Sequence, residues 1–598
     1  MLRYGAFRKA SARYGARARG RASARRRASA RRRASVLVWA FTLIVLVSLL
    51  AGCADLAQLL ISGPEEAPVA VFVAPTPEAA YPTEMSTAAR ILARGELVVG
   101  VRYDLEPFSY ITADSQLVGL EIDLVRELAR RWLGSSDAVR FRQVRSDTAL
   151  EYIAEGSVDV VLAGLIHTQD AEVWADFSPP YFANGMAILT YPDTGIQGLV
   201  DLSGRRVGTV SWTGSQGEVT AAATVTPTFT THNNFLDLVE VLRRREVDAY
   251  VDRRHRLERA RRMVTGSVIV GQWAWEPMAL AFRQDDPFFA NLVQLTFLDM
   301  AADGTRDALY DRWLPGTSPP SLDLLPGSAP APSLAASPQQ ISRLDVVSRI
   351  RDRGTLNAGY FPTLWPYSGD RDDGVPTGFE VRVLERMAEL WLGSSTAVTF
   401  VPVTDRAEAL QRLERGEVDI LLGAWEHTRE GELGADFSIT ILDDGVGILS
   451  LATNPIDDLP ALNGQSAGVV VGSAAEAAVP QLSQGAGLSA VGYSTFEAAL
   501  QGLQAGEVAA VLSERRPALE AHFRQSGYVF TDRRYTYRPI AFAVAEGDSD
   551  FRDLVNLTLM ALEERGIYQE LYSLWFDDPV PDLDTWPGLG VVSLSVQR

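Results

Sequence analysis

The sequence is nearly devoid of cysteine and lysine. Cys53 is the only cysteine and Lys9 the only lysine among 598 residues. A single cysteine excludes a disulfide within the chain. Because Schiff-base catalysis needs a lysine amine as nucleophile, a lysine confined to the N-terminal segment excludes that mechanism from the rest of the protein.

Basic charge is scarce beyond the N-terminal segment. Residues 1–52 hold 13 Lys and Arg and no Asp or Glu, whereas the remaining residues carry 43 basic and 75 acidic groups, a formal balance of −32. Nucleic-acid binding needs a basic face for phosphate contacts, so this acidic body argues against nucleic acid as a partner. With 47% apolar and 22% charged residues, a chain of this length can bury more than one core, and two or three domains are expected.

Long hydrophobic runs are missing except for Val36–Ala51, which follows an arginine-rich start. This order is typical of a secretory signal, and the run is short for a membrane span. Its end, Leu50–Cys53, resembles the lipobox of bacterial lipoproteins, in which the cysteine carries the lipid. We therefore expect an extracytoplasmic protein that is lipid-anchored to the cell membrane through Cys53. The alternative is a free cysteine buried in a transmembrane helix.

The chain repeats itself at a domain-sized interval. Three landmarks recur in order, at offsets of 259, 260 and 262 residues. A repeat of about 230 residues is a tandem duplication of a whole domain and not a solenoid. The paired landmarks are Trp132–Ser136 with Trp391–Ser395, Asp176–Ser178 with Asp436–Ser438, and Gly304 and Trp313 with Gly566 and Trp575.

The segment Pro315–Gln340, rich in Pro, Ser and Ala, separates the two copies and is typical of an extended spacer. A similar stretch follows Cys53. The predicted division is a signal peptide at 1–52, a tether at 53–87, a first domain at 88–315, a linker at 316–340, a second domain at 341–578 and a tail at 579–598.

Each copy alternates strand and helix patterns. The apolar runs Glu96–Val101 and Val158–Gly164 suit buried strands. Between them, Val125, Leu128 and Trp132 recur at helical spacing. This alternation predicts an α/β fold with mostly parallel sheets, in which ligands bind at the carboxyl ends of the strands.

Ordered landmarks in both copies resemble the family 3 solute-binding proteins, also called type II periplasmic binding proteins. The likeness covers about 90–315 and 345–577. It implies two tandem periplasmic-binding-protein-like domains, each with two α/β lobes, a two-strand hinge and a ligand cleft between the lobes. The landmarks are Gly95–Gly100, Pro107-Phe108, Gly119–Leu124, Gly156–Asp159, Asp176–Tyr181 and Asp201–Gly204 in copy one, and Gly354, Pro366-Tyr367, Gly378–Glu380, Gly416–Asp419, Asp436–Ser438 and Leu462–Gly464 in copy two.

The positions that hold an amino acid in this family are altered in both copies. The resemblance implies an arginine for the ligand carboxylate, where this chain has Ala171 and Gly431. It implies an aspartate for the ligand ammonium, where the chain has Arg253 and Glu514. Because only Glu514 is an anion, copy two is the better candidate for a zwitterion, and copy one suits an anion. The other departures are Ile166 and Glu426 in place of threonine, and Leu105 and Leu364 in place of an aromatic residue.

Residues near these altered positions are the candidate ligand contacts, against the alternative of solvated rim charges and packed aromatic side chains. His167 and His427 match one another, but one histidine per domain makes no metal site, so we expect a structural role near the cleft floor, with no cofactor. The candidates are Arg102, Asp104, Gly164, Trp212, Gly214, Asp252 and Arg253 in copy one, and Tyr360, Trp365, Trp425, Glu426, Arg429, Ser473 and Glu514 in copy two.

The predicted function is capture of a small polar ligand for an ABC permease, and not catalysis. One alternative is a ligand-sensing module for a partner chain. The other is a cyclohexadienyl dehydratase, an activity known on this fold, with Glu426 or Glu514 as the acid.

Overall fold

The computed structural model describes residues 85–210, 215–322, 344–524, 527–531 and 533–576, with short pieces at 325, 329, 331–336, 580–581 and 583. The predicted signal peptide and Cys53 lie outside the described residues, as do Trp212 and Gly214. Among the described residues, no helix combines the length and the apolar character that a membrane span requires.

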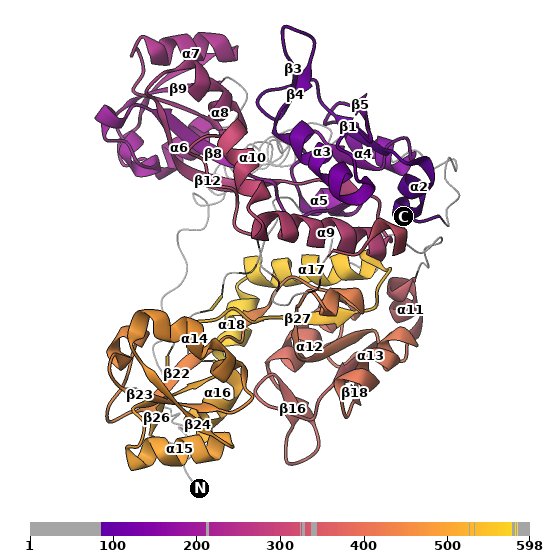
Figure 1. Ribbon diagram of the computed structural model, residues 1–598, viewed down its shortest axis with the longest axis vertical. Coiled ribbons are helices and arrows are strands. Elements are labelled where there is room, and N and C mark those ends of the chain that lie inside the picture. Colours follow the sequence, from indigo (N-terminus) through magenta and orange to yellow (C-terminus); the bar gives the residue numbers. More distant parts are fainter. Residues whose placement is uncertain are drawn as a thin grey trace, which may run out of the picture. The chain divides into compact units, whose positions relative to one another are not determined.

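The first copy folds into two α/β lobes (Figure 1). Its first lobe contains α2 (Thr87–Arg94), β1 (Leu97–Val101), β2 (Asp104–Leu105), β3 (Ser109–Ile111), β4 (Leu117–Val118), α3 (Leu120–Leu133), β5 (Val139–Gln143), α4 (Ala149–Ala154), β6 (Val160–Leu162), α5 (Gln169–Glu172), β7 (Asp176–Phe177), β13 (Ala281–Phe282), α9 (Pro287–Ala302) and α10 (Thr305–Trp313). Its second lobe contains β8 (Phe182–Thr190), η1 (Pro192–Thr194), η2 (Leu199–Leu202), β9 (Arg206–Val210), α6 (Ser215–Ala222), β10 (Thr228–His232), α7 (Phe235–Arg243), β11 (Ala249–Arg253), α8 (Arg254–Met263) and β12 (Val268–Met278).

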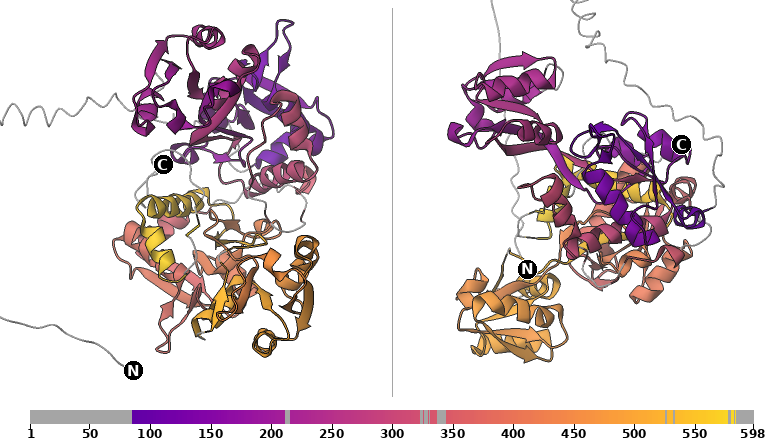
Figure 2. Two further views of the ribbon diagram at one scale, coloured as in Figure 1. Left: turned by 90° about the vertical axis from the view of Figure 1, so that its left-hand side faces the viewer. Right: turned by 45° about the horizontal axis from the view of Figure 1, so that its top comes forward.

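The second copy repeats this order, and Figure 2 shows both copies from two further sides. Its first lobe contains α11 (Val346–Arg353), β14 (Leu356–Tyr360), β15 (Thr363–Leu364), β16 (Ser368–Asp370), β17 (Pro376–Thr377), α12 (Phe379–Leu392), β18 (Val398–Pro402), α13 (Arg406–Glu414), β19 (Ile420–Glu426), η4 (Gly431–Leu433), β20 (Asp436–Phe437), β21 (Leu442–Asp443), β27 (Pro539–Val544), α17 (Ser549–Glu564) and α18 (Ile567–Ser573). Its second lobe contains β22 (Gly447–Leu451), η5 (Leu459–Leu462), β23 (Ser466–Val470), α14 (Ala474–Ala486), β24 (Ser489–Tyr493), α15 (Phe496–Ala505), β25 (Ala510–Ser513), α16 (Arg515–Arg524) and β26 (Tyr528–Phe530).

The sheets of matching lobes have matching topologies. The first lobes have the strand orders β5-β1-β6-β13-β7 and β18-β14-β19-β27-β20. The second lobes have the orders β10-β9-β11-β8-β12 and β24-β23-β25-β22-β26. In each first lobe the three strands that alternate with helices pair in parallel, and the strands arriving from the hinge pair antiparallel. The α/β class predicted from the sequence is confirmed.

The predicted helical stripe forms α3 in copy one and α12 in copy two. Val125 and Leu128 are fully buried in the core of the first lobe, and Leu384 and Met387 occupy the matching core of copy two. Burial of each such side chain contributes about 1.5–3 kcal/mol relative to exposure, so this apolar stripe fixes the helix on its sheet.

A glycine begins each of these two helices because a larger residue would not fit. Gly119 has a φ of 136°, and a Cβ atom there would lie 2.0 Å from the Phe108 carbonyl oxygen. Gly378 has the same φ, with the Tyr367 carbonyl oxygen at 2.3 Å. These close approaches explain why the glycine landmark stands at the same place in both copies.

Two chain crossings connect the lobes of each copy. In copy one, β8 and β12 pair antiparallel from Val268 opposite Thr190 to Met278 opposite Phe182. In copy two the crossings are divided into shorter strands, so that β21 pairs with β27 and β22 pairs with β26. Each copy therefore has the predicted two-strand hinge.

Three leucines anchor the predicted linker to copy one. Leu322 and Leu325 pack with Leu295 and Leu298 of α9. Leu334, in the short helix η3 (Leu334–Ala336), joins the core of the first lobe. These three residues of the linker are therefore held against copy one by apolar contacts, and the exact domain boundaries stay a prediction.

Candidate functional site

A buried glutamate holds the carboxyl end of the central strand in each copy. Glu380 of α12 accepts hydrogen bonds from the Gly423 and Ala424 backbone N–H groups, at 2.6 and 2.9 Å. In copy one, Glu121 accepts from the Gly164 N–H group at 2.9 Å and from the Ser109 hydroxyl at 2.6 Å. Both glutamates therefore fix the peptide groups that turn away from the sheet where a ligand is expected.

Burial is the main cause of the altered acidity of these glutamates. It raises the pKa of Glu380 to about 7, against the opposing effect of the two N–H groups and of Arg406. It also raises the pKa of Glu121. The sequence contained the signal for both residues in the repeated Gly-x-Glu landmark, but that landmark indicated only the fold.

Arg102 and Asp104 lie where β1 ends. The Arg102 Nε atom donates to Asp104 Oδ1 at 2.8 Å, and its Nη1 atom donates to the Ser146 hydroxyl at 3.3 Å. The hydrogen bond from Arg102 lowers the pKa of Asp104. The structure therefore brings these two candidates together as a partly exposed ion pair.

Gly164, at the end of the next strand, has a φ of 65°, and a Cβ atom there would lie 2.6 Å from a Leu105 methyl group.

The remaining candidates of copy one lie on β11. The Arg253 Nε atom donates to Glu276 Oε2 of β12 at 2.8 Å. Asn184 of β8 also donates to Glu276, at 3.1 Å. Asp252 is completely buried, and its carboxylate accepts from the Tyr250 hydroxyl at 2.6 Å. Arg253 is therefore neutralised by a hinge carboxylate, and Asp252 stabilises the interior of its lobe.

The hinge of copy two carries the opposite charge at the matching position. Arg538 precedes β27 and matches Glu276. Its Nε atom donates to Glu426 at 2.9 Å and its Nη1 atom donates to Asp444 at 2.8 Å. Sequence reasoning missed both hinge residues. When the two copies are aligned, however, a glutamate in copy one stands opposite an arginine in copy two, and this reversal of charge could have identified them.

Two aromatic candidates of copy two are packed side chains, and one of them lies beside Arg406. The Arg406 guanidinium lies 4.4 Å from the ring centre of the buried Trp425. Its Nη2 atom donates to the Gly423 and Ala424 carbonyl groups at 3.0 and 2.9 Å. Tyr360 is also buried and donates its hydroxyl to Asp370 at 2.7 Å. Trp425 and Tyr360 are therefore packed side chains at the edge of the expected site.

Glu514 and Ser473 meet at the first turn of α14. Glu514 Oε1 accepts from the Ala474 and Ala475 N–H groups at 2.7 and 3.3 Å. Ser473 caps the same helix by accepting from the Glu476 N–H group at 3.1 Å. The carboxylate thus lies at the positive end of the helix dipole, where an anion is stabilised.

Each copy has a contact between its two lobes, but the chemistry differs. In copy one the Arg259 Nε atom of α8 lies 3.2 Å from Glu106 Oε2, just before Pro107. In copy two the ring of Trp365, just before Pro366, packs edge-to-face on Phe523 of α16 at 5.7 Å. An ion pair therefore connects the lobes of copy one, and an aromatic pair connects those of copy two.

Arg429 and the two histidines lie where the copies meet. Arg429 donates to Asp299 of α9 at 2.6 Å, so its charge is directed at copy one. His167 bonds Glu172 and stacks on Phe177, with ring centres 4.5 Å apart. The matching contacts of copy two join His427 to Glu432 and to Phe437. The histidines have structural contacts, and both line a cavity to which the two copies contribute residues.

The duplicated two-lobed fold and the polar groups gathered at the strand ends define a class of ligand-binding protein. The model of the bacterial extracellular solute-binding proteins, family 3, matches residues 97–316 and 356–578. The chain belongs to this family.

Several relatives of the chain are binding proteins for amino acids. A glutamine-binding protein of Geobacillus stearothermophilus is 31% identical over 118 residues, which are 20% of this chain and 45% of that protein. The ABC transporter glutamine-binding protein GlnH of Bacillus subtilis (strain 168) is 23% identical over 40% of this chain and 88% of its own length. A solved structure of an ancestral cationic amino acid solute-binding protein is 26% identical, with a TM-score of 0.34, over 39% of this chain and 100% of that one.

Proposed function

We propose that the protein is a membrane-anchored extracytoplasmic solute-binding protein that captures an amino acid, or a related carboxylate or amine, for an ABC importer. The family and the amino-acid-binding relatives support ligand capture. Each copy would hold its ligand between its two lobes, and copy two is the better candidate for a zwitterion.

The position of Glu514 is the observation that favours copy two. Its carboxylate lies beside the Ala474 and Ala475 N–H groups, at the N-terminus of a helix of 13 residues. A ligand ammonium would pair with the Glu514 carboxylate, which these two N–H groups hold in place. Copy one has no matching anion, because Arg253 occupies that position and is paired with Glu276.

The two carboxylates of copy two that were candidates for a catalytic acid favour binding over catalysis. Glu426 accepts from Arg538, and Glu514 accepts from two backbone N–H groups. Both therefore act as hydrogen-bond acceptors, whereas the acid of a dehydratase must donate a proton to the leaving group.

Calorimetric titration of the full chain with L-glutamine, L-glutamate and L-arginine tests this assignment. We expect Glu514→Gln to weaken binding of the amino acid by about 10–100-fold, because a charge-assisted hydrogen bond contributes about 1.5–3 kcal/mol. The control is Arg253→Ala, which lies in the other copy and leaves that affinity unchanged. Binding that survives the first substitution and is lost in the second would place the ligand in copy one.

The membrane anchor is tested by Cys53→Ser. We expect the wild type to sediment with membranes and the variant to remain in the supernatant, because the thiol is the proposed site of the lipid. The measurement is immunoblotting of the membrane and soluble fractions, with a conservative Ser62→Ala variant as the control. A variant that still sediments with membranes contradicts the lipid anchor and leaves the ligand-binding proposal untouched.

A further inference from the structure

Contacts between the two copies recur with the roles of the copies exchanged. Gln284 of copy one donates to Asp553 of copy two at 3.2 Å. Asn291 of copy one donates to Glu546 of copy two at 3.5 Å. Residues 284 and 291 match residues 546 and 553 at a common offset of 262. The same pair of positions therefore meets twice, as in a dimer with a twofold axis.

One ion pair breaks this symmetry. Arg552 donates to Asp176 Oδ1 at 2.8 Å, and Ser549 donates to Asp176 Oδ2 at 3.0 Å. Asp436 matches Asp176, but the residue that matches Arg552 is Ala290. Within the part of the chain that the structure describes, no hydrogen bond or ion pair reaches the Asp436 carboxylate, although the residue is only 6% exposed.

Asp436 is therefore a buried carboxylate without a direct partner. Burial raises its pKa to about 8, against the opposing charge of Arg552, and the carboxylates of Glu432 and Glu546 raise the pKa further. A buried carboxylate is costly unless a cation or a proton neutralises it. This half of the contact thus lacks a direct ion pair like the one that Arg552 makes with Asp176.

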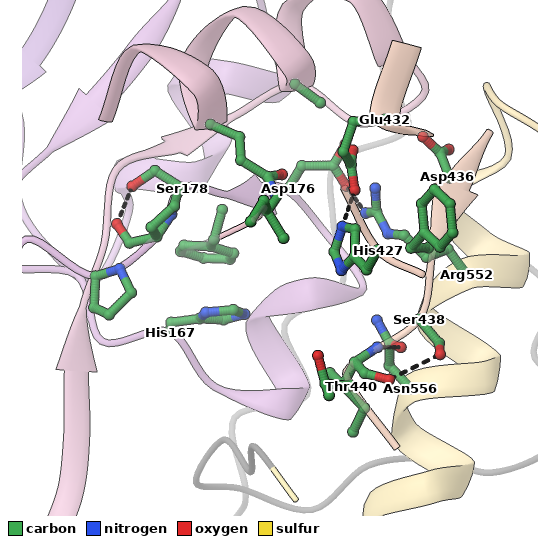
Figure 3. A pocket seen from close by; sticks show the side chains of 18 of the residues that line it. His167, Asp176, Ser178, His427, Glu432, Asp436, Ser438, Thr440, Arg552 and Asn556 are labelled. Atoms are coloured by element: carbon green, nitrogen blue, oxygen red, sulfur yellow. Dashed lines mark hydrogen bonds and ion pairs between the residues drawn. The ribbon is translucent and has the colours of Figure 1, made fainter. Parts of the chain in front are cut away.

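A cavity of about 510 Å³ lies at this place, and both copies line it (Figure 3). This volume is within the range of small-molecule sites. Among its lining residues are four carboxylates and a single arginine, together with the stacked rings of His167 on Phe177 and of His427 on Phe437. The charged residues are Glu172, Asp176, Glu432, Asp436 and Arg552.

We propose that this cavity binds a small organic cation, whose guanidinium or primary ammonium group pairs with Asp436 as the Arg552 guanidinium pairs with Asp176. The excess of buried carboxylates supplies the attraction, and the Asn556 amide N–H group adds a polar contact for the rest of the molecule. Such a site is separate from the two proposed amino-acid sites.

A metal ion is a poorer fit to the same carboxylates. Glu172, Asp176 and Asp553 have oxygen atoms within 4.8 Å of one another, which is the spacing of a metal site. However, Arg552 donates to Asp176 at 2.8 Å and to Asp553 at 3.3 Å. A guanidinium already neutralises this cluster, whereas Asp436 on the other side has no cation in direct contact among the described residues.

Thermal unfolding of the full chain with matched probes tests the proposal. The probes are ethylguanidinium chloride, its neutral isostere N-ethylurea, and MgCl₂ or MnCl₂ at equal ionic strength. A ligand that binds only the folded protein raises Tm in a saturable manner. We expect ethylguanidinium at low millimolar concentration to do so, and ethylurea and the metals to have no such effect. The proposal is overturned if ethylguanidinium leaves the Tm of the wild-type protein unchanged, or if only the metals raise it.

Two variants locate the response. Asp436→Asn removes the charge, and we expect the response to ethylguanidinium to be lost. Ala290→Arg supplies the guanidinium from the chain itself, so its Tm without ligand should rise and its affinity for ethylguanidinium should fall at least tenfold. Glu514→Gln is the control and keeps the full response. If the response survives in Asp436→Asn or in Ala290→Arg, or is lost in Glu514→Gln, the cavity is not the site.

Discussion

Replacing Arg552 by alanine is expected to lower the free energy of unfolding by about 3–5 kcal/mol, because removal of one partner leaves buried charges uncompensated. Arg552 donates to Asp176 and to Asp553, and both carboxylates are almost completely buried. Since Asp176 and Arg552 belong to different copies, we expect the substitution to destabilise the contact between the copies. Chemical denaturation of the full chain measures it.

A control and a compensating change make this result specific. Arg145→Ala removes an exposed ion pair with Asp147, and such pairs contribute about 0–1 kcal/mol. Combining Arg552→Met with Asp176→Asn removes one charge of each sign, and we expect it to restore part of the lost stability. Equal effects of Arg552→Ala and Arg145→Ala would show that Arg552 does not neutralise the buried carboxylates.

The second large effect is a pH dependence that comes from Glu380. Its pKa is about 7 in the folded protein, above the ordinary 4.5. Between these two values the folded state binds a proton that the unfolded state has lost. The stabilisation is therefore fully present below pH 4.5 and is lost as the pH rises to about 7. At 1.36 kcal/mol per pKa unit, the change amounts to about 3 kcal/mol.

Glu380→Gln isolates this contribution, because glutamine has nearly the same shape and does not titrate. The measurement is urea denaturation of the wild type and the variant across this pH range. We expect the unfolding free energy of the wild type to fall by about 3 kcal/mol relative to that of the variant as the pH rises. A constant difference would mean that the Gly423 and Ala424 N–H groups keep Glu380 ionised throughout.

The duplication made most of the fold predictable from the sequence. Residues with buried contacts inside one copy, such as Gly119 and Glu121, recur in copy two because the matching lobe has the same backbone and the same buried contacts. The helical stripe around Leu128 and the strand-like run before Gly164 are local patterns, and both are found as α3 and β6. Local periodicity and repetition therefore sufficed for the α/β class and the two copies, whereas the two lobes and the hinge of each copy were implied by the family resemblance.

The candidate site was less predictable because its residues have partners that no local pattern contains. Arg253 and Glu426 occupy the ligand positions that the family resemblance implies, and each is engaged by a hinge residue of opposite charge. Arg429 and His427 stand at the same strand end, yet they face copy one. A spacing rule within one copy contains no information on contacts between copies.

Covalent fusion of the copies has a consequence for the contact that Arg552 makes. In a homodimer every substitution enters both halves of an isologous interface, so an arginine gained at one end is gained at the other. On a single chain, positions 290 and 552 are encoded separately and can diverge. The linker also keeps the two surfaces at a high effective concentration, so the contact persists without both halves being optimised. In a duplicated chain, one half of the interface can therefore specialise while the other half keeps the two domains together.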